Sequence, residues 1–192
     1  MTQSDRPTEF DLIRTYFAPL AESEAGAFGL TDDAAVLPIE QGRELVATTD
    51  TIVAGVHFFE KTPADAVAAK LLRVSLSDLA AMGATPHSYT LSLALTDVIS
   101  SDWLGAFSAS LGRDQDTYGI TLVGGDTVTT PGPLTLTLTA MGTVLKGEAL
   151  RRNGAEVGDD VYVSGTIGDG ALGLLVALDK LTQLSKSEAD FL

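Results

Sequence analysis

The feature that most constrains the fold is a run of strict alternation, "PLTLTLTAMGTV", at residues 133–144. Apolar side chains occupy every second position, which is the period of a β-strand and not that of a helix. Two further runs, 44–53 and 88–96, combine β-branched residues with alternation and also predict strands. Weaker patterns predict shorter strands at residues 33–39, 120–123 and 159–165.

Helical patterns separate these strands. The clearest helix is expected at 62–82, where Thr62 could cap the first turn and Gly83 would end the helix. Other helices are expected at 9–20, 101–119 and 170–181. Because the order is mixed and the alternation looks antiparallel, we predict an α+β fold: a mixed or antiparallel sheet with helices on one face.

A polar, glycine-bearing stretch around residues 145–158 suggests a domain boundary. We expect residues 1–145 to form an N-terminal domain and residues 146–192 to be the start of a second domain. The second part is too short to close a core of its own.

Composition narrows the classes of function. Hydrophobic residues make up 45% of the chain, and the formal net charge is -14. So acidic a chain is a poor candidate for nonspecific binding to nucleic acid or anionic membranes. It could still bind phosphates through bridging metal ions. Without cysteine, disulfides and thiolate metal sites are excluded. No signal peptide or membrane-spanning run is recognisable, so we expect a cytoplasmic protein.

The acidic residues occupy unusual places. Asp50 lies in a β-rich run among threonines, and Asp126 follows "LVGG". Asp78 extends an otherwise apolar face of the 62–82 helix. A carboxylate there needs a cation or several donors, because burying it alone would cost several kcal/mol or force it to protonate. Pairing with an arginine or a loop explains Asp78 as well as metal binding does.

Structural explanations exist for the other motifs too. Asp50 could cap a turn, and the threonines beside it could express β propensity. The glycines of "GGDT" could form a tight turn, or could let the backbone approach a phosphate. A lone histidine such as His57 is more often structural than catalytic. Arg151 and Arg152 are either a solvated pair or a source of one phosphate contact.

Several acidic residues lie at the ends of predicted elements, hydroxyl residues flank one of them, and the sequence has no cysteine or histidine cluster. This combination suggests a site where oxygen ligands bind several Mg²⁺ ions. Such sites support phosphoryl transfer, since the ions neutralise phosphate charge.

The motifs "DDAAVL", "TTDTIVAGVHF", "SLSDLAAMGATP", "LVGGDT" and "RRNGAEVGDD" occur in the order seen in thiamine-monophosphate kinases. These belong to the aminoimidazole ribonucleotide synthetase-like ATP-binding superfamily. The resemblance covers nearly all of residues 9–178. It implies a kinase that transfers the γ-phosphate of ATP to thiamine monophosphate, with several Mg²⁺ ions and no covalent nucleophile. It also implies a homodimer in which two sheets form a barrel-like core.

The resemblance also implies roles for individual residues. ATP would be bound by Gly125, Asp126 and Arg152. His57 would line the side of the site that binds thiamine monophosphate. Magnesium ligands would be Asp33, Thr48, Thr49, Asp50, Asp78 and Asp126. The choice of Asp33 over Asp32 rests on the resemblance alone.

Two departures from the family pattern stand out. The glycine-rich lead "GIGDD" appears here as "GLTDD", with Thr31 before Asp32. Family members also continue through the rest of a second α/β domain, so this chain resembles a truncated form. We expect it to dimerise but to have little activity alone. The alternatives are another ATP-dependent enzyme of the superfamily and a noncatalytic dimerisation module.

Overall fold

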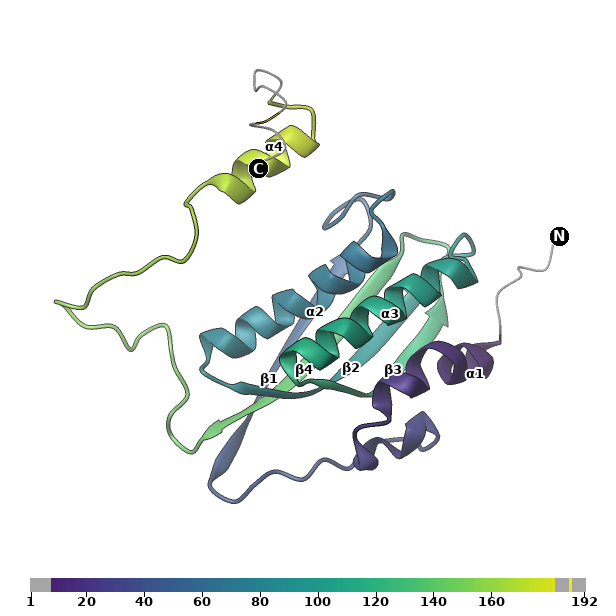
Figure 1. The fold of residues 1–192 in the computed structure, drawn as a ribbon, viewed down its shortest axis with the longest axis horizontal. Helices are drawn as coiled ribbons and strands as arrows, with labels where there is room; N and C mark the ends of the chain where they lie inside the picture. The colour runs from purple at the N-terminus through teal and green to yellow at the C-terminus, as the bar shows by residue number, and fades with distance from the viewer. Residues whose placement is uncertain (1–7, 182–186, 188–192) are drawn as a thin grey trace. The chain divides into compact units, whose positions relative to one another are not determined.

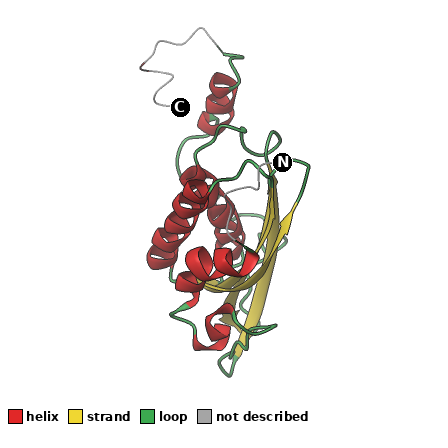
Figure 2. Ribbon diagram, turned by 90° about the vertical axis from the view of Figure 1, so that its right-hand side faces the viewer, coloured by secondary structure: helices red, strands yellow, loops and turns green. Residues whose placement is uncertain are grey.

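The computed structural model describes residues 8–181 and residue 187. The chain divides into two compact units, Met1–Arg151 and Arg152–Leu192. The first unit contains a four-stranded sheet and two long helices (Figures 1 and 2). Among the described residues, no helix has the length and apolar character needed to cross a membrane.

The sheet is mixed, with strand order β1-β4-β2-β3. Its strands β1 and β4 are antiparallel, β4 and β2 are antiparallel, and β2 and β3 are parallel. The strand bounds are Arg43–Val53 for β1, Thr85–Leu95 for β2, Thr121–Thr129 for β3 and Thr135–Leu145 for β4. The three strongest strand predictions and the α+β class are therefore confirmed.

One face of this sheet is covered by α2 (Ala64–Ala81) and α3 (Ser101–Tyr118), as Figure 2 shows. Alternation along β4 directs Leu136, Leu138 and Ala140 into the core beneath the helices, where none is exposed to solvent. The opposite face, here called the open face, carries mainly hydroxyl side chains: Thr49, Thr51, Thr90, Ser92, Thr137 and Thr139.

The ends of the two long helices follow local signals. Ser100 accepts a hydrogen bond from the Trp103 N–H and caps α3, and Gly119 ends α3 in the left-handed region with φ 65°. The predicted cap at Thr62 is wrong, because Pro63 occupies the N-cap position of α2 and no side chain caps it. Gly83 follows the end of α2, as predicted.

A polar network joins α2, α3 and β2. Arg73 donates two hydrogen bonds to the buried carboxylate of Asp114, at 2.9 and 2.8 Å, and this contact raises the pKa of Arg73. Tyr89 is fully buried and donates to Gln115 Oε1 at 2.9 Å. Burial, and secondarily the charge of Asp114, raise the pKa of Tyr89 far above its ordinary value.

The N-terminal segment is helical but irregular. The predicted helix at 9–20 consists of α1 (Glu9–Leu12), the π-helix η1 (Ile13–Phe17) and the 3₁₀-helix η2 (Ala18–Ala21). A second 3₁₀ segment, η3 (Ala25–Leu30), follows and contacts β3.

The predicted strand at 33–39 is wrong. Residues 33–39 pair with no strand. The Val36 N–H donates a hydrogen bond to the Gly26 carbonyl of η3. Ala35 and Leu37 pack against a small cluster formed by Ala21, Ala27 and Val123. Apolar packing therefore explains the pattern that suggested a strand.

The second unit contains α4 (Asp169–Ala177), within the predicted helix at 170–181 apart from its first residue. The strand predicted at 159–165 is wrong. Those residues have no regular structure, and Val161 and Tyr162 are 91% and 87% exposed. A strand requires a neighbouring strand for its backbone hydrogen bonds, and the described part of this unit provides none.

Candidate functional site

Asp50 and Asp78 meet where β1 packs against α2. Asp50 lies on the face of β1 that turns toward the helices, because Ile52 follows on that same face and is buried in the core. Asp78 lies in the last turn of α2, one turn after Ser75. Strand alternation and helical periodicity thus bring together two of the carboxylates that the sequence singled out.

Two crossed hydrogen bonds hold these carboxylates. Thr48 of β1 donates to Asp78 Oδ2 at 2.7 Å, and Ser75 of α2 donates to Asp50 Oδ2 at 2.9 Å. Each element therefore supplies one hydroxyl donor and one carboxylate acceptor. We call Thr48, Asp50, Ser75 and Asp78 the strand–helix group.

Thr49 was predicted to be a ligand together with its neighbours, but it lies on the other side of β1. Its hydroxyl is 2.9 Å from the hydroxyl of Thr139, and both belong to the open face. Within one chain, Thr49 and Asp50 therefore point to opposite faces of the edge strand β1.

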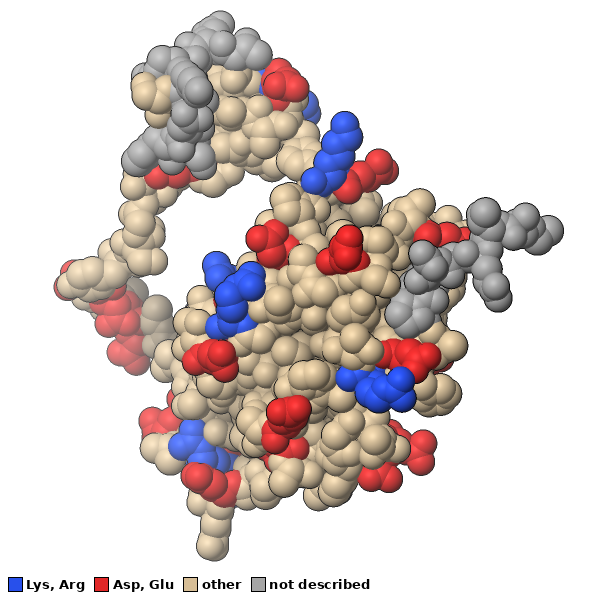
Figure 3. Space-filling view, turned by 45° about the vertical axis from the view of Figure 1, so that its right-hand side comes forward, with Lys and Arg blue, Asp and Glu red and all other residues tan. Residues whose placement is uncertain are grey.

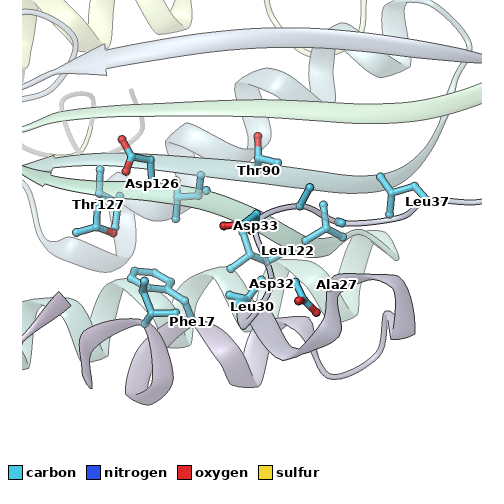
Figure 4. Close-up of a pocket in the computed structure, with 18 of the residues that line it drawn as sticks. Phe17, Ala27, Leu30, Asp32, Asp33, Leu37, Thr90, Leu122, Asp126 and Thr127 are labelled. Carbon is cyan, nitrogen blue, oxygen red and sulfur yellow. The ribbon is translucent and has the colours of Figure 1, made fainter. Parts of the chain in front are cut away.

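The second acidic region is a pocket beside β3, the other edge strand. It has a volume of about 460 Å³, and we call it the β3 pocket. Asp33 reaches it from the loop after η3, whereas Asp126 reaches it from β3 (Figure 4). Asp32 also lines it. Apolar side chains form much of the remaining wall, among them Phe17, Leu30, Leu91, Leu122 and Val123.

The "GGDT" motif lies inside β3 and forms no turn, so that alternative is wrong. The pairing of β2 with β3 shifts here, from Tyr89 opposite Leu122 to Thr90 opposite Gly124. Gly125 is needed for close approach of the strands: a Cβ on it would lie 1.9 Å from the Leu91 carbonyl oxygen. Both glycines of the motif also line the β3 pocket.

The strand–helix group and the β3 pocket are not brought together within one chain. Asp50 pairs with Leu138, which pairs with Leu91, so Asp50 faces the helices. Asp126 pairs with Ser92, the next residue of β2, and therefore points to the open face. Two strands separate β1 from β3, a distance of roughly 14 Å at the usual strand spacing.

The carboxylate and hydroxyl oxygens of these regions suit Mg²⁺ better than they suit an ion that takes all of its ligands from the protein. Over the described ranges, no three His, Cys, Asp or Glu side chains are grouped to hold a metal. Mg²⁺ is usually held by one or two carboxylates, with waters and substrate phosphates completing its octahedron. Asp50 and Asp78, with a hydroxyl on each, provide such a partial set.

His57 lies outside both regions, in the turn after β1. Its Nδ1 accepts a hydrogen bond from the Val53 N–H at 3.1 Å. Its backbone carbonyl accepts a hydrogen bond from Lys70 of α2. A neutral imidazole with Nδ1 as acceptor carries its proton on Nε2, so this exposed side chain offers one N–H donor.

Arg152 begins the second unit and is exposed. Its predicted contact with ATP phosphates stays a prediction.

The surface charge offers no strongly basic docking area for phosphates on the face drawn in Figure 3. Acidic side chains are dispersed over that face, and the lysines and arginines stand singly or in small groups among them. A polyphosphate bound on this face would therefore depend on local donors and on metal ions for neutralisation.

Sequence reasoning missed Ser75, which is fully buried and bonded to Asp50. The available signal was its spacing: Ser75 precedes Asp78 by three residues, so the two share a helix face. The threonine partners across the sheet were not predictable, because their pairing depends on the register of β1 with β4.

Comparison with known proteins identifies the fold. The family described as AIR synthase related protein, N-terminal domain, matches residues 31–144, which is more than half of the chain. The chain belongs to this family. The strand–helix group and the three aspartates of the β3 pocket, Asp32, Asp33 and Asp126, fall within the matched residues.

Curated proteins named thiamine-monophosphate kinase are among the relatives of this chain. A thiamine-monophosphate kinase of Caulobacter vibrioides is 49% identical over 172 residues, covering 88% of this chain and 48% of the relative. The crystal structure of a thiamine-monophosphate kinase from Stenotrophomonas maltophilia has a TM-score of 0.74 at 44% identity. It covers 84% of this chain and 52% of that one.

A second similar structure is described as AaThiL complexed with AMPPCP and TMP. Its TM-score is 0.69 at 28% identity, and the match covers 86% of this chain and 57% of that chain. The chain thus spans about half the length of the curated relatives it matches. The predicted relationship to thiamine-monophosphate kinases is confirmed.

Proposed function

We propose that this protein binds ATP and thiamine monophosphate and, with Mg²⁺, transfers the γ-phosphoryl group to form thiamine diphosphate. The observation that carries the proposal is its 49% identity to a thiamine-monophosphate kinase over 88% of the chain. The two acidic regions supply the oxygen ligands that such a reaction requires. A cytoplasmic location would suit this activity.

Each group of residues has a distinct task in the proposal. Bound Mg²⁺ would neutralise the charge of the phosphates and of the transferring group. Asp50, Asp78 and Thr48 hold metal-facing oxygens in a fixed arrangement at β1. Asp33 and Asp126 do so at the β3 pocket. Thr49 of β1 is a further ligand, on the open face.

The remaining predicted residues would hold the two substrates. The backbone of Gly125 would lie along the nucleotide, and Arg152 would contact its phosphates through a charge-assisted bond. His57 would donate from Nε2 to an oxygen on the thiamine-phosphate side. No side chain acts as a nucleophile, because the acceptor is the substrate's own phosphate, so catalysis rests on alignment and charge stabilisation.

We further propose that a second copy of the chain completes the site. Because the strand–helix group and the β3 pocket lie at opposite edges of one sheet, they could meet only across two sheets. A homodimer with its open faces turned inward, in the manner of a barrel, would place the β3 edge of one copy near the β1 edge of the other. It would also cover Thr137, Thr139 and their neighbours. The outer edges of β1 and β3, which pair with no further strand among the described residues, would be covered as well.

In this proposal residues 1–145 form the ATP- and metal-binding dimerisation domain, and residues 146–192 begin a second domain that carries Arg152.

Calorimetry with AMPPCP tests the proposal. Wild-type protein should bind the analogue in the presence of Mg²⁺ and lose binding when EDTA is added. Asp50→Asn and Asp126→Asn should each reduce affinity at least about tenfold, because each removes a metal ligand. Asp102→Asn, in the exposed first turn of α3, is the matched control and should bind normally. Folded protein that binds no nucleotide under any condition would instead indicate a noncatalytic dimerisation module.

A further inference from the structure

Ser75 is a hydroxyl buried beside a carboxylate that the proposed function uses. It has no exposed surface, lies in the middle of the core-facing side of α2, and donates to Asp50 Oδ2 at 2.9 Å. A serine hydroxyl has a single hydrogen to donate. In this fold that hydrogen is directed to Asp50, so the carboxylate oxygen on the α2 side is already satisfied.

The other oxygen of Asp50 has a different environment. No other described side chain or backbone group donates a hydrogen bond to this carboxylate, and the residue is only partly buried. The single bond from Ser75 therefore restricts rotation of the carboxylate and leaves Oδ1 free to bind a cation. The same arrangement, reversed, holds Asp78 through Thr48 at 2.7 Å.

We propose that Ser75 is a positioning residue, which orients Asp50 for a divalent cation without contacting the cation itself. This inference rests on the proposed function, because it assumes that Asp50 binds Mg²⁺. Groups that hold a metal ligand in this way commonly change metal affinity by about 10- to 100-fold when removed. They act by fixing the ligand before the ion arrives, so that binding does not have to order it.

The test is Mg²⁺ affinity, measured by calorimetry on the full chain in wild type and Ser75→Ala. The matched control is Ser110→Ala: Ser110 is also a buried helical serine, but it donates at 2.9 Å to the Asp65 carbonyl, away from both acidic regions. We expect Mg²⁺ to bind about tenfold more weakly to Ser75→Ala. Ser110→Ala should lose a similar amount of stability and no Mg²⁺ affinity.

A second measurement separates positioning from general weakening of the fold. Urea unfolding without metal is compared for Ser75→Ala, Asp50→Asn and the double variant. If Ser75 holds Asp50, the two substitutions should be non-additive in stability, and Ser75→Ala should not weaken Mg²⁺ binding further in the Asp50→Asn background.

The outcomes are distinct. Equal Mg²⁺ affinity in wild type and Ser75→Ala would overturn the positioning role and leave the proposed function intact. Equal losses in Ser75→Ala and Ser110→Ala would also overturn it. Wild-type protein that binds no Mg²⁺ would overturn the proposed function and the positioning role together. Additive stability effects would show that the Ser75–Asp50 bond contributes nothing in solution.

Discussion

Replacing either glycine of "GGDT" by alanine separates a structural requirement from a binding role. A Cβ on Gly125 would lie 1.9 Å from the carbonyl oxygen of Leu91, 2.8 Å from its carbonyl carbon and 3.1 Å from its nitrogen. A Cβ on Gly124 would meet only the methyl of Thr90, at 3.8 Å. The two positions are adjacent and line the same pocket, so each is a control for the other.

The expected cost at Gly125 follows from this contact. The Leu91 backbone belongs to β2 and cannot rotate away, so the strands must separate by roughly 1.5 Å, which costs about 1–3 kcal/mol. One or two hydrogen bonds of the β2–β3 ladder would weaken, at about 1 kcal/mol each. We expect Gly125→Ala to lose about 3 kcal/mol. For a chain of this length that corresponds to a fall in melting temperature of about 6–12 °C.

Gly124→Ala should behave in the opposite way. The methyl fits, and the unfolded chain loses conformational freedom, so the free energy of unfolding should rise by about 0.5 kcal/mol. Urea unfolding followed by circular dichroism measures both variants. Equal stability of Gly124→Ala and Gly125→Ala would refute the reasoning, because it would mean that the strands do not approach as closely at Gly125 as the structure indicates.

Two further predictions concern the core and the open face. Because its pKa is raised, Tyr89 keeps its proton in the folded state, whereas tyrosine in the unfolded chain ionises at about pH 10. The free energy of unfolding should therefore fall by about 1.4 kcal/mol per pH unit above that value. Tyr89→Phe should make this fall less steep. Tyr162→Phe, at an exposed position, should leave this slope unchanged. Thr139→Lys should convert a dimer to folded monomer in light-scattering measurements, since it places a charge in the proposed dimer core; Ser77→Lys, on the exposed side of α2, should not.

The helices and strands were predictable where burial of one face sets the spacing of apolar residues along the sequence. Residues 133–144 alternate because one face of β4 packs under the helices, and 62–82 has helical spacing because α2 buries one side. The failures at 33–39 and 159–165 share a cause. A short apolar run can pack against other residues or stay exposed without forming a strand. Whether it forms a strand depends on a pairing partner that the local sequence does not reveal.

The acidic residues of the two regions could be singled out from the sequence, but their arrangement in the fold could not. Asp50 and Asp78 were singled out from their local patterns, and the fold does bring them together. That Asp126 lies on the other face and at the other edge depends on strand order and on the register of β3, which are long-range properties. The bond from Ser75 to Asp50 depends on the packing of β1 against α2.

In the proposed dimer, one nucleotide site draws its acidic ligands from two copies of the chain. Mixing Asp50→Asn and Asp126→Asn proteins, after joint unfolding and refolding, tests it directly. Mixed dimers would contain one site with both native carboxylates, so Mg²⁺-dependent AMPPCP binding should recover to about a quarter of the wild-type site number, as expected for random pairing in a two-fold dimer. If both carboxylates act within a single chain, the mixture will bind no more nucleotide than either variant alone, and that result would contradict a site shared between two copies.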